Sequence, residues 1–258
     1  MDTGKWAEID LDTTDFAYTG GALKKAWKEL HAGDLEPWPD ESMLQDGWRA
    51  FHAGDFAAAV DAGLAAGGDG HVLANKASGI YADYLEEDDD ARQAIYQAGI
   101  VRAEAATQAE PDNPNAHYFR AYHLGRYSQC ISIAKALSQG LGGKIRTSLD
   151  RALELAPDHA EAHTAMGLYH AEIIAKVGKL MGSMTYGASA DKAIEHFEEA
   201  IRLTDAPIAW IEYGNGLYLL HGDKKVDESN DAYAKAAAMK PIDAMQALDV
   251  RFASDSLT

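Results

Sequence analysis

Three amphipathic stretches of this chain end in the same way, at a proline turn. They are residues 152–158 (ALELAPD), 200–207 (AIRLTDAP) and 236–241 (AAAMKP). The first two lead into a further amphipathic segment that carries a glycine, Gly167 or Gly214. Proline stops a helix, and glycine lets two helices approach closely. The pattern therefore predicts a chain built from repeated helix pairs.

The periodicity of apolar residues predicts an all-α fold. From Ser42 onward apolar residues recur three and four residues apart, and no alternating β-branched run is long enough for a strand. Residues 1–40 differ, because turn-rich segments at 10–15 and 37–40 flank one predicted short helix, from Gly21 to His31. We expect an N-terminal lead-in segment over residues 1–40 and a helical repeat domain over residues 41–258.

The closing turns are unevenly spaced. From Pro111 to Pro157 the interval is 46 residues, from Pro157 to Asp205 it is 48, and from Asp205 to Pro241 it is 36. Only the last interval is close to the roughly 34 residues of a tetratricopeptide unit. In the longer units the excess lies within the helix pairs, between the small residues at which the helices are expected to cross. An added function is most expected there.

Several motifs carry a resemblance to known families. Three sets of residues resemble the signature of tetratricopeptide repeats. They are Gly47 with Ala59; Gly167, Ala193, Phe197 and Ala200; and Trp210, Tyr213, Gly214, Tyr233, Ala236 and Pro241. Residues 113–225, with NP…HY…AY, ALELAP, AH…MG and KAI…F…A, resemble the repeat domain of the regulator-of-microtubule-dynamics family and are similar to bacterial TatT-type proteins associated with TRAP transporters. The resemblance implies a curved solenoid of tetratricopeptide-like helix pairs with elongated interior hairpins. TatT-type proteins also enclose an apolar tunnel. We expect no membrane anchor before the repeats, which argues against a membrane-tethered role.

The concave side of such a stack is lined by the first helix of each pair. Carrying over the groove positions of tetratricopeptide repeats gives a mostly apolar set of predicted ligand- or partner-binding residues: Trp48, Phe51, Ile80, Tyr84, Tyr118, Tyr122, Leu168, Ile211 and Tyr218. Two interpretations stay open. The set is either helix packing or a hydrophobic concave groove that holds a partner protein segment or a small lipid-like ligand.

Two glycine-rich segments need an explanation. Residues 140–144 (GLGGK) lack the first glycine and the final hydroxyl residue of a phosphate loop, so we expect a reversal between two helices that requires positive backbone angles. Residues 178–187 are rich in glycine and methionine. They suit a lid over a pocket, a flexible partner surface or an ordinary interhelical loop.

The chain shows no pattern typical of catalysis or of metal binding. His159, His163 and His170 lack an acidic or cysteine partner on the same helix face, so we expect packing in place of a zinc site, and no cofactor. His117 stands at the place of His163 one unit earlier, which favours duplication. The single cysteine, Cys130, is expected to be a packed apolar residue. We therefore predict a non-enzyme that acts as a scaffold. The alternatives are a structural subunit of a homo-oligomer and an unrecognised enzyme.

Charge and hydropathy limit the partners. With 23 basic and 41 acidic residues the net charge is −18, which repels nucleic acids and anionic lipids unless a local basic patch overrides it, and none is evident along the sequence. No stretch reaches the roughly 18 apolar residues of a membrane helix, and the N-terminus does not read as a signal peptide. We expect no nucleic acid, no integral membrane segment and a cytoplasmic location, or a periplasmic one if a signal peptide has been removed.

Overall fold

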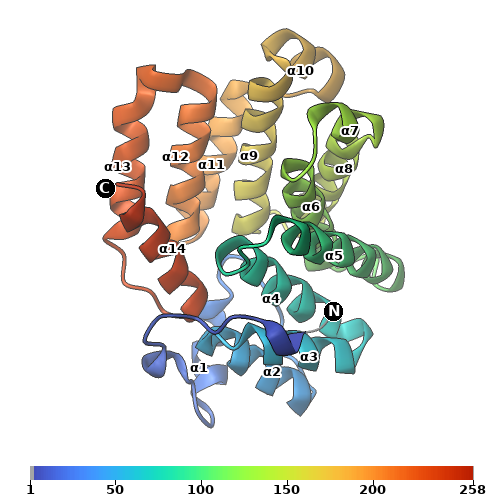
Figure 1. Cartoon of the computed structure of the whole chain (residues 1–258), viewed down its shortest axis with the longest axis vertical. Helices are drawn as coiled ribbons and strands as arrows, with labels where there is room; N and C mark the ends of the chain where they lie inside the picture. Colours follow the sequence, from blue (N-terminus) through green and yellow to red (C-terminus); the bar gives the residue numbers. More distant parts are fainter. Residues whose placement is uncertain (1–2, 258) are drawn as a thin grey trace.

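The computed structural model describes residues 3–257, apart from the side chain of Asp69. The described residues form helices, turns and loops without a strand (Figure 1). The all-α prediction is confirmed. The lead-in segment contains two short 3-10 turns, η1 (Thr3–Lys5) and η2 (Thr14–Phe16), and the predicted short helix, which is α1 (Ala22–Leu30).

Five helix pairs follow, and in each pair the two long helices pack against each other. The pairs are α2 (Ser42–Ala53) with α3 (Phe56–Ala66), α4 (His71–Tyr84) with α5 (Asp89–Ala109), α6 (Pro114–Gln129) with α8 (Leu141–Leu155), α9 (Ala160–Val177) with α11 (Ala190–Leu203), and α12 (Pro207–His221) with α13 (Val226–Ala237). A last helix, α14 (Ala244–Asp255), packs on the fifth pair, and short 3-10 turns η3 (Gly68–Gly70) and η4 (Gly222–Lys225) join neighbouring helices.

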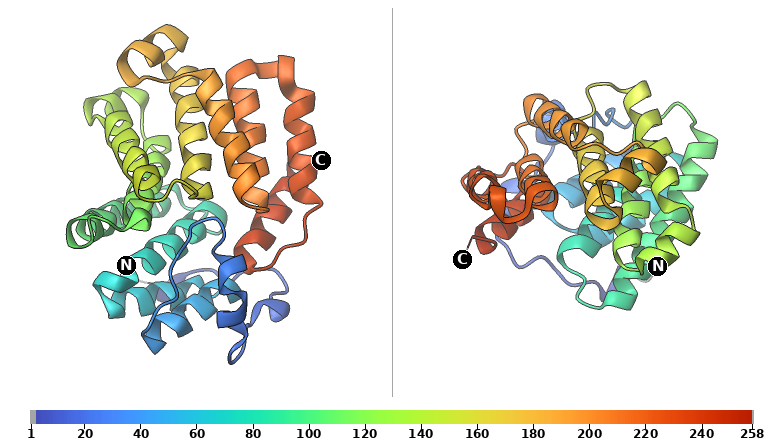
Figure 2. Two further views of the ribbon diagram at one scale, coloured as in Figure 1. Left: turned by 180° about the vertical axis from the view of Figure 1, so that it is seen from behind. Right: turned by 90° about the horizontal axis from the view of Figure 1, so that it is seen from above.

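The extra length of the third and fourth pairs forms two short helices. These are α7 (Ile133–Ser138) and α10 (Lys179–Tyr186), each of which connects the two long helices of its pair along the chain. Both lie at one end of the molecule, opposite α1, α2 and α3 (Figure 1 and Figure 2). The sequence placed the excess within these pairs correctly. Residues 178–187 are thus not a simple loop but a helix between two glycines with positive φ, Gly178 (83°) and Gly187 (64°).

Glycines mark the helix crossings, as predicted. Phe197 of α11 is fully buried between Gly167 of α9 and Gly216 of α12. A Cβ atom added to Gly167 would lie 2.8 Å from the Phe197 ring, and one added to Gly216 would lie 2.3 Å from it. A Cβ atom added to Gly47 of α2 would lie 2.8 Å from Ala62 of α3, in the same pair, and 2.6 Å from Leu73 of α4 in the next pair. No side chain larger than hydrogen fits these crossings without movement.

The proline turns repeat in atomic detail. Nε2 of His117 lies 2.8 Å from the carbonyl oxygen of Pro111, and Nε2 of His163 lies 2.9 Å from that of Pro157. In each case a histidine in the first turns of a helix donates to the proline that closed the preceding helix. This shared contact supports duplication of the unit.

The last helix returns to the start of the chain. Asp243, the N-cap of α14, lies 2.9 Å from Nδ1 of His52 on α2, and the hydroxyl of Tyr18 donates to the carbonyl oxygen of Ile242 at 2.6 Å. The lead-in segment packs on the same core, where Trp6 stacks on Tyr81 with ring centroids 3.9 Å apart. The stack of pairs therefore curves far enough for its two ends to touch (Figure 1).

Two local expectations need comment. Gly140 has a φ of 64° and caps α8, so the predicted reversal is present, but Gly142 and Gly143 lie inside α8. Cys130 is exposed, so its expected burial as a packed apolar residue was wrong. It follows the last turn of α6, where the chain leaves the core for α7.

Candidate ligand-binding cavity

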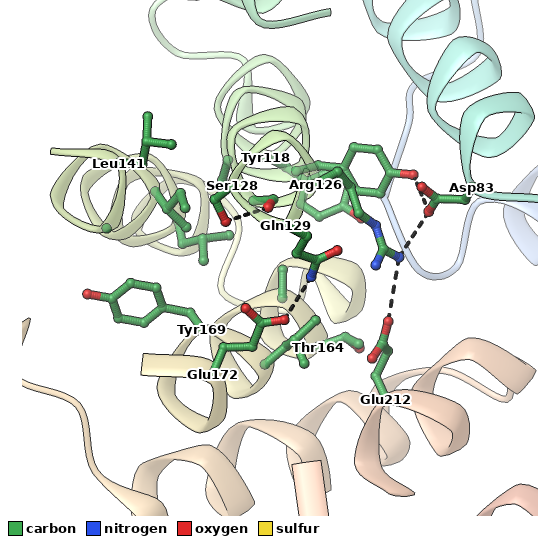
Figure 3. A pocket seen from close by; sticks show the side chains of 18 of the residues that line it. Asp83, Tyr118, Arg126, Ser128, Gln129, Leu141, Thr164, Tyr169, Glu172 and Glu212 are labelled. Atoms are coloured by element: carbon green, nitrogen blue, oxygen red, sulfur yellow. Dashed lines mark hydrogen bonds and ion pairs between the residues drawn. The ribbon is translucent and has the colours of Figure 1, made fainter. Parts of the chain in front are cut away.

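A cavity with a solvent-accessible volume of about 190 Å³ lies on the concave side of the stack. Its walls come from α6, α8 and α9, from which most of the side chains labelled in Figure 3 project. One end is formed by α4, α12 and α14, and the other lies beside α7 and α10. The wall is largely apolar and includes Leu141, Ile145, Leu149, Leu168, Ile173 and Val177. First helices of four pairs contribute to it, as expected for the inner face of such a stack.

The structure brings together five of the nine predicted groove residues. Those that line the cavity are Ile80, Tyr84, Tyr118, Tyr122 and Leu168. Trp48 and Phe51 do not line it, because α1 covers the first pair and Trp27 packs edge-on against Trp48. Ile211 is buried against the last helices, and Tyr218 points to solvent with 52% of its surface exposed. That the five bind a ligand stays a prediction.

At the buried end the cavity has a charged floor, which begins with Lys76 of α4. Nζ of Lys76 lies 2.6 Å from Oδ2 of Asp34 and 2.7 Å from Oε1 of Glu161. Burial alone would lower the pKa of Lys76, but the two carboxylates outweigh burial and raise it. Burial would likewise raise the pKa of Asp34, yet Lys76 and His31 hold it well below its usual range. For Glu161 burial prevails over Lys76 and raises the pKa.

The second cation of the floor is Arg126 of α6. Its Nη2 lies 2.9 Å from Oδ2 of Asp83 and 3.6 Å from Oε1 of Glu212 (Figure 3). Its guanidinium also stands over the ring of Tyr122, whose hydroxyl donates to the same Asp83 at 2.7 Å. Burial raises the pKa of Glu212 in spite of Arg126. Each cation of the floor is thus held between two carboxylates.

One carboxyl group of the floor is only half satisfied. Asp249 of α14 is 1% exposed, and its Oδ1 accepts a hydrogen bond from the hydroxyl of Tyr84. Within residues 3–257 its Oδ2 has no hydrogen-bond partner. Burial raises the pKa of Asp249 to about 8, so it is largely protonated at neutral pH. A neutral carboxyl group can both donate to and accept from a ligand.

Sequence reasoning missed the acidic residues of this floor. Asp83, Glu161, Glu212 and Asp249 were not singled out from the sequence. A signal was present: Asp83 follows Ile80 by three residues on the face that was predicted to line the groove, and Glu161 precedes Leu168 by seven. Burying an acidic side chain costs free energy unless it is paired, so an acidic residue on a predicted inner face is a candidate for a binding site.

The three histidines singled out from the sequence do not form one cluster, although His163 and His170 both contact the ring of His196. His159 caps α9, since its Nδ1 accepts from the amide of Ala162 and its Nε2 lies 2.8 Å from Oδ1 of Asn115. His163 instead pairs with His196, with 2.8 Å between the Nδ1 atoms. In the described part of the chain no group of three or more His, Cys, Asp or Glu residues is arranged to hold a metal ion.

Comparison with known proteins agrees with the architecture. Paired helices, proline turns and crossing glycines define a helical repeat protein of the tetratricopeptide type. The fold is similar to the crystal structure of TTC0263, a thermophilic TPR protein in Thermus thermophilus, with a TM-score of 0.58 over 84% of this chain and 98% of that one. The sequences are 18% identical, so this likeness concerns the fold alone. The family model described as regulator of microtubule dynamics protein 1-3 matches residues 66–247. The match covers more than half of the chain, and the chain belongs to this family.

No curated protein matches the chain. Among residues 3–257, none of the helices combines the length and the apolar character needed to cross a membrane.

Proposed function

We propose that this protein is a non-catalytic binding module that holds a small lipid-like ligand in the cavity. The observation that carries the proposal is an apolar-walled cavity with a polar floor at its buried end. Such a combination suits a molecule with a long apolar body and one polar end. The lining includes Tyr118, Tyr122 and Leu168, which the sequence selects as groove residues.

The charge of the floor limits the polar end of the ligand. Lys76 and Arg126 each already neutralise carboxylates, so neither supplies an unpaired positive charge for a phosphate or a free carboxylate. The free Oδ2 of Asp249 offers a hydrogen bond to a hydroxyl or an amine. An uncharged or cationic head group is therefore favoured over an anionic one.

A second candidate is a segment of a partner protein in the same cavity. The fold favours it, because repeat stacks present extended concave surfaces on which other chains bind. The charged floor favours the smaller ligand, since a peptide that ran through the cavity would have to displace the paired Lys76 and Arg126.

The first experiment is extraction of the purified protein with organic solvent, followed by mass spectrometry. A lipid-like molecule in stoichiometric amount is expected. The delipidated protein is then titrated with hexadecanol, hexadecylamine and palmitate against a bound apolar fluorophore. We expect the first two to displace the fluorophore at least about tenfold more tightly than palmitate, which corresponds to roughly 1.4 kcal/mol.

A matched pair of variants locates the site. Ala165 lines the cavity, whereas Ala105 of α5 is exposed on the outside. Ala165→Trp fills the cavity and should abolish ligand binding, while Ala105→Trp should leave it unchanged. If the extract contains no lipid-like molecule and both variants bind the probes with equal affinity, the cavity does not hold such a ligand. A protein partner would then be the better explanation.

A further inference from the structure

Two segments differ in charge from the rest of this acidic chain. Residues 130–149 and 173–190 contain no acidic residue, so all 41 acids of a chain with net charge −18 lie elsewhere. The same segments hold five basic residues, Lys135, Lys144, Arg146, Lys176 and Lys179. Inspection along the sequence found no basic patch, because this one is divided between two distant segments. In the folded protein these basic residues gather at one end, so the expectation of no basic patch was wrong.

The fold brings the two segments to the same end of the molecule. The first forms α7 and the start of α8, the second forms the end of α9 and α10, and both stand at the end opposite α1 (Figure 1 and Figure 2). They meet where Tyr186 packs on Gly142, since a Cβ atom added to Gly142 would lie 3.0 Å from that ring. Leu137 and Val177 belong to these segments and line the cavity. The basic end and the exposed end of the cavity are therefore the same place.

Large apolar side chains are exposed at this end. We call five of them the apolar tip: Ile133 (48% exposed) and Leu137 (47%) on α7, with Leu180 (76%), Met181 (56%) and Met184 (79%) on α10. A concentration of exposed apolar residues on one end marks a surface that binds something. Of the basic residues around it, Lys176 pairs with Glu172 and Arg146 with Asp150. Lys144 and Lys179 form no ion pair with any residue in the described range 3–257.

We propose that the apolar tip docks on an anionic membrane surface. Leucine, isoleucine and methionine would enter the boundary between head groups and acyl chains, and the lysines would meet the lipid phosphates, as in interfacial helices. A protein partner is disfavoured by the absence of aromatic residues and the excess of lysine, because protein interfaces are enriched in aromatic residues and arginine and depleted in lysine, whereas methionine is common at both kinds of surface. The tip itself has no aromatic residue, and lysine outnumbers arginine around it.

This inference extends the proposed function without requiring it. Docking by the tip would place the exposed end of the cavity against a bilayer, which is the natural source of a lipid-like ligand. The docking surface and the cavity use different side chains at their centres, namely Leu180 and Met184 for one and Ala165 and Leu168 for the other. The two ideas can therefore fail separately.

The experiment is flotation of the protein with phosphatidylcholine vesicles, with and without phosphatidylserine. We expect binding to the anionic vesicles only, and its weakening by high salt. Leu180→Asp/Met184→Asp and, separately, Lys144→Glu/Lys179→Glu should each weaken binding more than about tenfold, since each lysine near an anionic surface contributes roughly fivefold. Val101→Asp is the matched control, because Val101 is 68% exposed on α5, far along the chain from the tip, and should bind as the wild type does.

Three further readouts decide the interpretation. Circular dichroism should be the same for all variants, as expected for exposed positions. The cavity-filled Ala165→Trp protein should still bind anionic vesicles, and loss of vesicle binding there, or in Val101→Asp, would overturn the proposal. Light scattering gives the oligomeric state of the wild type and of Leu180→Asp/Met184→Asp. A wild-type oligomer that this double variant dissociates would also overturn the proposal, because the tip would then bind a second copy of the chain. Equal binding of wild type and tip variants to vesicles contradicts it as well.

Discussion

The hydroxyl of Tyr84 on α4 donates a hydrogen bond to Oδ1 of Asp249 on α14. This contact joins the second helix pair to the last helix, 165 residues further along the chain, at the floor of the cavity. It stands beside the contact of His52 with Asp243, which joins α2 to the same helix. Buried polar contacts thus join the last helix to the first two helix pairs, and the cavity lies on the inner side of the stack that these contacts close.

The buried carboxyl of Asp249 should give a stability effect that depends on pH. Its folded pKa of about 8 lies far above the value near 3.9 of an unfolded Asp. Below about pH 4 both states are protonated, and above that unfolding releases a proton, so the contribution of this group to folding is lost as pH rises toward 8. Asp249→Asn keeps a neutral side chain. Its free energy of unfolding should exceed that of wild type by an amount that grows with pH, by up to about 1.4 kcal/mol per unit.

Urea unfolding of both proteins at pH 4, 6 and 8 measures this difference. The values at the lowest pH serve as the internal reference, because there the carboxyl is neutral in the folded state and only about half ionised in the unfolded one, so its effect is smallest. A constant difference across the range would mean that Asp249 is ionised in the folded protein.

Removal of Lys76 should be strongly destabilising. Lys76→Met keeps the length of the side chain but leaves Asp34 and Glu161 buried without their shared cation. Breaking a buried ion pair from one side typically costs about 3–5 kcal/mol. Chemical denaturation checks the value. Arg202→Met is the control, because Arg202 pairs with Glu199 at the surface and such pairs contribute at most about 1 kcal/mol. Similar small losses in both variants would be inconsistent with a structural role of Lys76.

The crossing glycines can be tested through Phe197. Gly216→Ala places a Cβ atom 2.3 Å from the present ring position and should cost about 1–3 kcal/mol. The double variant Gly216→Ala/Phe197→Leu should lose less than the sum of its two single changes, because the smaller side chain makes room. Gly143 lies on α8, and a Cβ atom added to it would have no neighbour within 4 Å apart from the helix's own backbone. Gly143→Ala should therefore raise the free energy of unfolding, by up to about 1 kcal/mol. Thermal unfolding of the four proteins tests this set, and additive losses would show that Phe197 does not limit the crossing.

Much of the architecture was predictable because it depends on local signals. Pro157 and Gly167 mark a turn and a crossing through backbone geometry alone, and their recurrence identified helix pairs. The same spacing located the inserted helices α7 and α10, although their helical form was not foreseen for residues 178–187. Glycine and methionine there are compatible with both a loop and a short helix, and the contact of Tyr186 with Gly142 of α8 lies outside what local sequence shows.

The floor of the cavity depended on long-range contacts that periodicity does not contain. Lys76 meets Asp34 across 42 positions and Glu161 across 85, and nothing in either neighbourhood signals the pairing. Trp48 and Phe51 failed to reach the cavity for the same reason, since the lead-in segment covers the face on which they lie. The pattern selected five residues that line the cavity, but it did not show which faces another element covers.

The most direct measurement is a crystal structure of the delipidated protein soaked with a long-chain alcohol that carries bromine at the end of its chain. Anomalous scattering then locates the bromine without assumptions about the ligand. A lipid-like ligand in the cavity predicts one strong peak between α8 and α9, near Ile145 and Ile173, with the hydroxyl toward Asp249. A cavity without ordered density, with bromine at other surfaces or at none, would contradict it.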